Sequence, residues 1–281
     1  RQRHLTIPCE MCIRDRITGA SSGMGNVFAR ELAKEGHIVY GAARRVEMLA
    51  GLHQYHVKTL PLDVTDDASM QACVSEILQK EGRIDVLVNN AGYGSYGTVE
   101  EVPMEEAKRQ MEVNVFGLAR MTQLVLPGMR QQKSGTIINI SSIGGKIATP
   151  FGAWYHASKF AVEGMSDSLR TEVAPFGIDV VVIEPGGVKS EWSDIAYQNL
   201  LKTTANTAYG EMAGKFKAAF EKTVPKNAEP EVIATLVSRA VNAKRPKTRY
   251  VGGYLAKTVL FFRKWCSDRM MDRILLSQLR N

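Results

Sequence analysis

Short apolar runs alternate along this chain with longer segments that have the periodicity of amphipathic helices. Five runs rich in β-branched residues are predicted to be strands, at 37–40, 57–62, 84–89, 136–140 and 178–184. The segments predicted to be helices are 24–35, 67–81, 104–130, 153–175 and 229–243. Strands that are apolar throughout are typical of a parallel sheet covered on both faces. The alternation therefore predicts an α/β fold with a doubly wound parallel sheet.

Length and composition fit one domain of this class. The chain has 281 residues, of which 44% are hydrophobic and 23% charged. We predict a domain at 17–250, with a lid at about 191–225. No apolar run reaches the roughly 20 residues needed to cross a bilayer. The four cysteines are unevenly spaced and no signal peptide is recognised, so a reducing, cytoplasmic location is expected.

The positive charge of the chain is concentrated at its ends. The net charge is +7, and from Lys244 onward there are ten Lys or Arg and only two Asp or Glu residues. A nucleic-acid-binding protein would need a basic face on its body, so nucleic acid is not an expected partner. Residues 251–281 are predicted to form a basic amphipathic tail that packs on its own domain, on a second subunit or on a membrane surface. Peripheral membrane contact through 254–279 is one of these alternatives.

The segment before the first glycine-rich turn is unusual. A buried strand is expected there, but the chain has Arg14, Asp15 and Arg16 in succession. Burying three charges in the middle of a sheet carries a large desolvation cost. We therefore predict that residues 1–16 are not a native N-terminus, with a displaced or shortened strand as the alternative.

A glycine-rich turn comes directly before the first predicted helix. Its glycines follow the spacing G-x-x-x-G-x-G, at Gly19, Gly23 and Gly25. Glycines allow a tight turn and a close approach of a pyrophosphate to the backbone. The free amides at the start of the helix can then bind phosphate oxygens. An ordinary loop is the alternative for such a turn considered alone.

The end of the second predicted strand indicates which dinucleotide is bound. Ala43 occupies the position where an NAD-binding chain usually has an acid for the ribose 2′-hydroxyl, and Arg44 and Arg45 follow it. A guanidinium matches a 2′-phosphate in charge and geometry. We therefore favour NADP(H) over NAD(H), although the two arginines could merely solvate a loop. Asp63 and Val64 follow the third strand and are expected near the adenine ring.

A serine, a tyrosine and a lysine form a candidate catalytic set. Tyr155 and Lys159 are four residues apart on a predicted helix and so leave the same face, and Ser142 precedes them. A nearby ammonium favours the phenolate and is expected to lower the pKa of the tyrosine. Such a phenol can exchange a proton with the oxygen of a ketone or an alcohol. A Tyr/Lys pair alone is more often an ordinary surface pair, so the interpretation depends on the other motifs.

These motifs resemble one family in their order and intervals. T-G-A-S-S-G-M-G, Asp63-Val64, N-N-A-G ending at Gly92, Asn114 in E-V-N-V-F-G, Ser142, Y-x-x-x-K and P-G-G-V-K-S ending at Ser190 occur in sequence. The chain resembles a short-chain dehydrogenase/reductase of the T-G-x-x-x-G-x-G type over roughly residues 17–190, which implies a Rossmann fold. It is most similar to the branch that includes 17β-hydroxysteroid dehydrogenase-like reductases.

The resemblance implies a role for each matching residue. Tyr155 would be the proton donor or acceptor, Lys159 would bind the nicotinamide ribose, Ser142 would orient the substrate oxygen, and Asn114 would kink its helix so that a main-chain carbonyl holds a relay water. Together with the reasoning above, it places the cofactor on Gly19, Ser21, Ser22, Gly23, Met24, Gly25, Arg44, Arg45, Asp63, Val64, Asn90, Ala91, Gly92, Tyr155, Lys159, Pro185, Gly186, Val188 and Ser190. Ser190 stands where threonine is usual in this family.

The substrate is expected to be a hydrophobic ketone, aldehyde or alcohol. The predicted pocket lies between 93–96, 144–154 and 191–225, where the aromatic residues are Tyr93, Phe151, Trp154, Trp192 and Tyr197. These residues do not select among sterol-like, retinoid-like or long-chain compounds.

Several other interpretations were weighed. A non-catalytic NADP-binding sensor and a sugar-nucleotide epimerase are the rival functions, and an intact Ser–Tyr–Lys set disfavours the sensor. No metal is expected, since Cys9 and Cys12 with His53 and His56 lack the spacing of a zinc site. Relatives commonly form dimers or tetramers through the helices at 104–130 and 153–175, so a homo-oligomer is expected.

Overall fold

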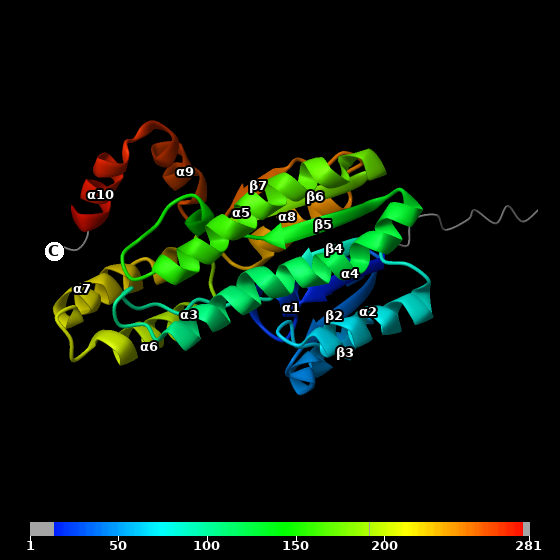
Figure 1. Ribbon diagram of the computed structural model, residues 1–281, viewed down its shortest axis with the longest axis horizontal. Coiled ribbons are helices and arrows are strands. Elements are labelled where there is room, and N and C mark those ends of the chain that lie inside the picture. Colours follow the sequence, from blue (N-terminus) through cyan, green and yellow to red (C-terminus); the bar gives the residue numbers. More distant parts are fainter. Residues whose placement is uncertain (1–13, 191, 278–281) are drawn as a thin grey trace, which may run out of the picture.

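A seven-stranded parallel sheet forms the centre of the molecule (Figure 1). The structure is a computed structural model that describes residues 14–190 and 192–277. In spatial order the strands are β3, β2, β1, β4, β5, β6 and β7. Their bounds are β1 Arg14–Thr18, β2 Ile38–Ala43, β3 Lys58–Pro61, β4 Val86–Asn89, β5 Gly135–Ile140, β6 Ile178–Pro185 and β7 Arg249–Gly252. This arrangement confirms the predicted doubly wound α/β fold.

Helices cover both faces of the sheet. On one face lie α1 (Gly23–Lys34) and α8 (Glu231–Val241), which bury residues such as Phe28 and Val237 against the strands. On the other lie α2 (Asp67–Glu81), α4 (Gly117–Gln132) and α5 (Ala153–Val173), with Met121 and Ile77 in a second core. Short 3₁₀ helices occur at Val46–Tyr55, Ile143–Gly145, Ala174–Phe176 and Val224–Lys226. The order reverses between β1 and β4, which is where ligands bind in such sheets.

The single helix predicted at 104–130 is interrupted. It consists of α3 (Met104–Met111), a π-helical turn at Glu112–Phe116 and α4. A Cβ added to Gly117 would lie 2.4 Å from the carbonyl oxygen of Val64, so the start of α4 is pressed against the loop after β3. π-helical turns are frequent at functional sites, and this one contains Asn114.

The strand β1 includes the charged segment that precedes the glycine-rich turn. Asp15 pairs with Val39 of β2 and Val86 of β4, and its side chain is buried. Neither carboxyl oxygen has a hydrogen-bond partner among the described residues, and the His37 Nδ1 lies 3.8 Å from one of them. The sheet thus extends three residues before the predicted domain start at 17, and the expected desolvation cost falls on Asp15. That residues 1–16 are not native stays a prediction, and 1–13 lie outside the described residues.

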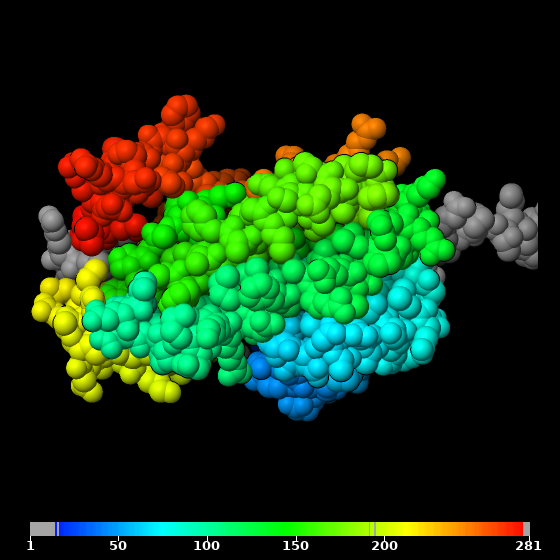
Figure 2. Space-filling view, in the orientation of Figure 1, coloured from blue at the N-terminus to red at the C-terminus, as the bar shows by residue number. Residues whose placement is uncertain are grey.

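Two helical pairs follow β6 in the chain. The predicted lid region contains α6 (Trp192–Thr204) and α7 (Gly210–Glu221), and the tail contains α9 (Ala256–Trp265) and α10 (Asp268–Ser277). In Figure 1 both pairs lie at the same end of the molecule, and in Figure 2 the tail helices stand out from the body. The strand β7 between them was not predicted, because it is only four residues long and half-buried. Within the described part of the chain, no helix combines the length and apolar character needed to span a bilayer.

Candidate active site

The glycine-rich turn after β1 is packed tightly against the chain that leaves β4. Gly19 has a φ of +69°, and a Cβ at this position would lie 2.9 Å from the Cα of Ala91. A Cβ at Gly25 would lie 2.4 Å from the carbonyl oxygen of Gly19. Both positions therefore require glycine. Gly25 does not line the adjoining pocket, so its predicted place in the cofactor site is a packing role rather than a contact.

Thr18 and Asn90 hold this turn in place. The hydroxyl of Thr18 accepts hydrogen bonds from the backbone amides of Asn90 and Ala91, each at 2.9 Å. The side-chain amide of Asn90 donates to the carbonyl oxygen of Thr18 at 3.0 Å. Thr18 was missed as a site residue, although it begins the glycine motif and its position at the end of a strand could have indicated it.

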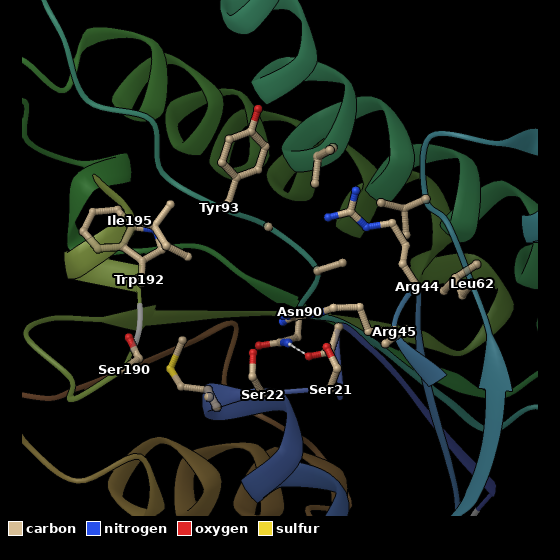
Figure 3. Close-up of a pocket in the computed structure, with 18 of the residues that line it drawn as sticks. Ser21, Ser22, Arg44, Arg45, Leu62, Asn90, Tyr93, Ser190, Trp192 and Ile195 are labelled. Atoms are coloured by element: carbon tan, nitrogen blue, oxygen red, sulfur yellow. Dashed lines mark hydrogen bonds between the residues drawn. The ribbon is translucent and has the colours of Figure 1, made fainter. Parts of the chain in front are cut away.

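A cavity of about 300 Å³ lies over this turn (Figure 3). It is lined by most of the residues that were predicted to bind the cofactor: Gly19, Ser21, Ser22, Gly23, Met24, Arg44, Arg45, Asp63, Val64, Asn90, Ala91, Gly92 and Ser190. Leu62, Val113, Trp192 and Ile195 also line it and were not predicted to do so. We call this cavity the dinucleotide pocket.

The start of α1 suits an anionic group. Ser22 is the N-cap residue but makes no side-chain hydrogen bond to the helix, and the first turn of α1 contains no acidic residue. The first backbone amides of a helix have no partner within it and favour a negative charge. The residues present therefore fit the pyrophosphate of a dinucleotide.

Basic side chains gather at the far end of the dinucleotide pocket. In Figure 3 the side chain of Arg44 extends from the end of β2 into the pocket. Lys108 and Arg109 of α3 line an adjoining hollow together with Arg44 and Asp63. Sequence reasoning missed these two cations because they are far from Arg44 in the chain and no motif marks them.

The Ser–Tyr–Lys set is brought together on one side of the sheet. Tyr155 and Lys159 are buried on α5, and the Lys159 Nζ is 5.9 Å from the centre of the Tyr155 ring. Lys159 donates to the carbonyl oxygen of Ile140 at the end of β5, at 2.8 Å. Ser142 caps the turn after β5 and accepts a hydrogen bond from the amide of Gly144 at 3.0 Å. The arrangement places one hydroxyl, one phenol and one ammonium around the same space.

The electrostatics of this set differ from the sequence-based expectation. Burial raises the pKa of Tyr155 to about 12, and a hydrogen bond with Ser142 only partly opposes this. Burial also lowers the pKa of Lys159 to about 8, opposed by the carboxylate of Glu163. The expected lowering of the Tyr155 pKa by the lysine is not found, because desolvation of the phenolate is the larger effect. At neutral pH the phenol therefore carries its proton.

Asn114 connects the π-helical turn to the loop after β4. Its side chain accepts from the amide of Tyr93 at 3.0 Å and donates to the carbonyl oxygen of Tyr93 at 2.9 Å. It also donates to the hydroxyl of Ser158 on α5 at 3.0 Å. Asn114 lines neither cavity; its side chain fixes the backbone around Gly92 and the face of α5 next to Lys159.

A second cavity, of about 340 Å³, opens from the Ser–Tyr–Lys set. We call it the substrate cavity. The predicted residues Ser142, Tyr155, Lys159, Pro185, Gly186, Val188 and Ser190 line it. Its other walls are largely apolar and come from the 143–150 loop, α6, α7 and the tail, and include Tyr96, Ile143, Ile147, Trp192, Phe216, Phe220, Leu255, Val259 and Leu275. The contribution of the tail was not predicted, because sequence reasoning treated 251–281 as a separate segment.

Three aromatic residues predicted for the pocket do not line it. The ring of Phe151 packs behind that of Phe216, with centroids 5.3 Å apart, and Tyr197 packs on Phe220 at 5.3 Å. Trp154 precedes Tyr155 on α5 and so leaves a different face of the helix. Trp192 and Tyr93 do line both cavities.

Trp192 and His156 shape the boundary of the substrate cavity. The Trp192 ring lies 4.9 Å from the Tyr155 ring, between centroids, and a Cβ at Gly94 would meet it at 2.3 Å. His156 accepts a hydrogen bond from the amide of Thr149 at 3.0 Å, and its other ring nitrogen lies 2.9 Å from the carbonyl oxygen of Gly144. Burial lowers the pKa of His156. Through these contacts, His156 holds the two ends of the loop at 144–149.

The residues considered as a zinc pattern fall only partly within the described part of the chain, 14–190 and 192–277. No group of three or more His, Cys, Asp or Glu side chains there is arranged to hold an ion. The ring of His53 is bonded to the hydroxyl of Thr59 at 2.9 Å. Cys9 and Cys12 lie outside the described residues.

Comparisons with known proteins agree with the fold and the motifs. The family model for short chain dehydrogenases matches residues 16–199. A 3-ketodihydrosphingosine reductase from Bacteroides thetaiotaomicron is 39% identical over 259 residues, which are 91% of this chain and 94% of that protein. An NADPH-dependent 3-dehydrocapnine reductase from Ornithobacterium rhinotracheale is 34% identical over 277 residues, covering 94% and 96%. The crystal structure of a short-chain dehydrogenase from Streptomyces avermitilis has a TM-score of 0.77 at 33% identity, covering 89% of this chain and 92% of its own.

Proposed function

The chain belongs to the short-chain dehydrogenase family and is an oxidoreductase. From this premise we propose that it uses NADP(H) and interconverts a hydrophobic ketone or aldehyde and its alcohol. The observation that carries this proposal is that a buried phenol lies beside a serine hydroxyl and a lysine, where the substrate cavity adjoins the dinucleotide pocket. The narrower resemblance to 17β-hydroxysteroid dehydrogenase-like reductases stays a prediction.

Tyr155 acts as the acid of the reductive direction in this proposal. Because burial raises its pKa to about 12, it carries a proton at neutral pH and can give it to a carbonyl oxygen. Ser142 can donate a hydrogen bond to the same oxygen and stabilise the charge that develops there. When bound, NADPH supplies the hydride that the carbonyl carbon receives. Asn114, through Tyr93 and Ser158, positions the backbone and the helix face on either side of Lys159.

The preference for NADP(H) rests on the basic end of the dinucleotide pocket. Arg44 lines it and Ala43 occupies the position where an acid would favour NAD, with Lys108 and Arg109 next to Arg44. The Ornithobacterium relative is named as NADPH-dependent, which supports the same choice.

We infer that the substrate is a long-chain ketone. The substrate cavity continues from Tyr155 between apolar side chains of α7, α9 and α10, such as Phe220, Val259 and Leu275, and an alkyl chain would bury its surface there. The Bacteroides relative, named for 3-ketodihydrosphingosine, supports a lipid-like substrate.

Replacement of Tyr155 by Phe tests the catalytic assignment. The Tyr155→Phe variant loses the proton donor, so turnover of a long-chain ketone is expected to fall by at least about a hundredfold. NADPH binding, followed by the fluorescence of the dinucleotide, is expected to stay within about threefold because the dinucleotide pocket keeps its glycine turn and arginines. The matched control is Tyr96→Phe, which removes a hydroxyl from another wall of the same cavity. Wild-type turnover in the purified Tyr155→Phe protein would disprove the role.

A homo-oligomer is proposed for the assembly. Phe116, in the π-helical turn, and Phe160, on α5, are 56% and 46% exposed, and they belong to the helical region that commonly forms the subunit contact in this family. Sedimentation equilibrium of the wild type and of Phe160→Asp measures this directly, and a monomeric wild type would contradict it.

A further inference from the structure

The outer face of α9 is aromatic although it is exposed. The side chains of Phe261, Phe262 and Trp265 are 62%, 47% and 70% exposed. Residues three and four apart lie on one face of a helix, so Trp265 is next to both phenylalanines. Such a cluster of exposed large apolar side chains indicates an interaction surface, since soluble monomers rarely leave one uncovered.

The opposite face of the tail helices is the one that packs on the body. Ala256 and Met271 are buried there, and Val259 and Leu275 line the substrate cavity. The tail is therefore a wall one helix thick: its inner side contacts the substrate cavity and its outer side carries the aromatic cluster. In Figure 2 this wall stands out from the body at the end where the lid also lies.

The second tail helix continues the exposed face and adds charge. Met270 and Ile274 of α10 are 53% and 37% exposed and lie one turn apart. Arg269 and Arg273 run beside them with the same spacing and are exposed, while the exposed carboxylates of Asp268 and Asp272 lie on the same helix, Asp268 pairing with Arg263. Lys257 and Lys264 flank the aromatic cluster on α9. Apolar residues bordered by cations are typical of helices that lie in the headgroup region of an anionic bilayer.

We propose that the outer face of α9 and α10 docks on the surface of an anionic lipid bilayer, so that the tail-lined end of the substrate cavity lies next to the lipid and a long-chain ketone enters from it. The docking on a bilayer is argued from the exposed residues of α9 and α10 alone. Only the entry of a long-chain ketone from the lipid rests on the proposed function. A second copy of the chain is the other possible occupant. It is disfavoured because a two-fold contact would place the same cations of both copies close together.

Vesicle flotation of the full-length protein tests the docking surface. We expect the wild type to float with vesicles of phosphatidylcholine and phosphatidylglycerol and not with phosphatidylcholine alone, with binding weakened by salt. The double variant Phe261→Ser/Trp265→Ser is expected to bind anionic vesicles at least about tenfold more weakly, since its two largest inserting side chains are gone. The matched control is Phe176→Ser, which removes an exposed aromatic residue from the 3₁₀ helix that follows α5.

Each other outcome overturns the proposal. A wild type that does not float with anionic vesicles excludes the bilayer as the occupant. Equal binding by the double variant and the Phe176→Ser control shows that another surface binds. A double variant that changes from dimer to monomer in sedimentation while still floating assigns the face to a second copy. Activity separates this proposal from the proposed function: a chain that floats but reduces no ketone contradicts only the function, and one that reduces ketones but does not float contradicts only the docking.

Discussion

At the scale of single residues, burial decides the protonation of the candidate catalytic groups. It moves the pKa of Tyr155 up to about 12 and that of Lys159 down to about 8, because it disfavours the charged form of each. The phenol is thus protonated throughout the neutral pH range, whereas the lysine titrates near the upper end of that range. The same buried lysine is held by the carbonyl oxygen of Ile140, so its position depends on a main-chain group of β5.

The titration of Lys159 predicts a pH limit on reduction. Lys159 is charged below its pKa of about 8 and neutral above it. If its charge holds the cofactor ribose and stabilises the developing phenolate, kcat/KM for ketone reduction falls as pH rises above about 8. The measurement is kcat/KM between pH 6 and 10 at saturating NADPH. A kcat/KM profile that is level up to pH 10 would count against the role of the charge. The Lys159→Arg variant stays charged, so its kcat/KM should not fall between pH 8 and 10.

Arg44 is predicted to select the phosphorylated dinucleotide. Arg44→Ala removes a charge-assisted contact to the 2′-phosphate, so the Kd for NADPH should rise about tenfold to a hundredfold. The Kd for NADH should change less than about threefold, because NADH lacks that phosphate. Arg83→Ala removes an arginine that pairs with Asp85 outside the dinucleotide pocket and serves as the control. Equal losses for both dinucleotides would refute the NADP(H) preference.

At the scale of elements, β1 is where local sequence and fold disagree. Considered alone, the three consecutive charges of Arg14–Arg16 argue against a central strand. The backbone nevertheless pairs with β2 on one side and β4 on the other. The main chain of a strand hydrogen-bonds in the same way whatever its side chains are, and the glycine-rich turn must follow a strand at this place in the sheet. The cost remains in the Asp15 carboxyl, whose pKa is raised well above its usual value by burial, with Asp85 and Glu35 adding to the effect.

Asp15 is accordingly predicted to weaken the fold at neutral pH. A carboxyl with a raised pKa in the folded state contributes no penalty below its usual pKa near 3.8, and it destabilises the fold increasingly as pH rises above that value. Asp15→Val should therefore raise the free energy of unfolding by roughly 1–3 kcal/mol at pH 7. Urea denaturation at pH 7 and pH 4 measures it, with a smaller gain expected at pH 4. The exposed Asp272→Val is the control, and destabilisation by Asp15→Val at pH 7 would contradict the argument.

At the scale of the whole molecule, one buried ionic cluster ties the C-terminal part to the sheet. Arg249 of β7 contacts Glu163 and Asp167 of α5 at 2.9 and 2.8 Å, and Glu184 of β6 at 3.3 Å. Burial and the nearby Glu163 raise the pKa of Glu184 to about 7. Lys146 adds a contact to Glu163 at 2.8 Å from the loop that borders the substrate cavity. The strand β7, which leads into the tail, is thus anchored by carboxylates from two other elements, α5 and β6.

Removal of Arg249 is predicted to cost more than removal of a surface arginine. Arg249→Met leaves the buried carboxyls of Glu163 and Glu184 with one cation fewer, so we expect a loss of about 2–4 kcal/mol in urea denaturation at pH 8. The loss should shrink at pH 5, where Glu184 is protonated without assistance. Arg170→Met, which breaks a partly exposed pair with Asp167 at the rim of the cluster, should cost under about 1 kcal/mol. Similar losses for the two variants would show that the cluster is not a strong anchor.

The fold class could be predicted from the sequence alone, as could many of the residues that line the two cavities. Strand and helix periodicity is local, and each of the motifs that contain Gly19, Asn90 and Tyr155 spans only a few residues. Parallel strands then bring their carboxyl ends to one edge without further information. This is why residue patterns alone could place the glycine turn, Arg44 and the Ser–Tyr–Lys set at one edge of the sheet, whereas their roles stay predictions.

Features that depend on contacts between distant parts of the chain could not be predicted from the sequence. Lys108 and Arg109 line the same hollow as Arg44, and Val259 and Leu275 of the tail line the substrate cavity, although no periodicity relates these positions. The pKa values of Tyr155 and Lys159 likewise follow from how completely other elements exclude water from them. Burial is a property of packing between elements, and a local pattern of residue types does not contain it.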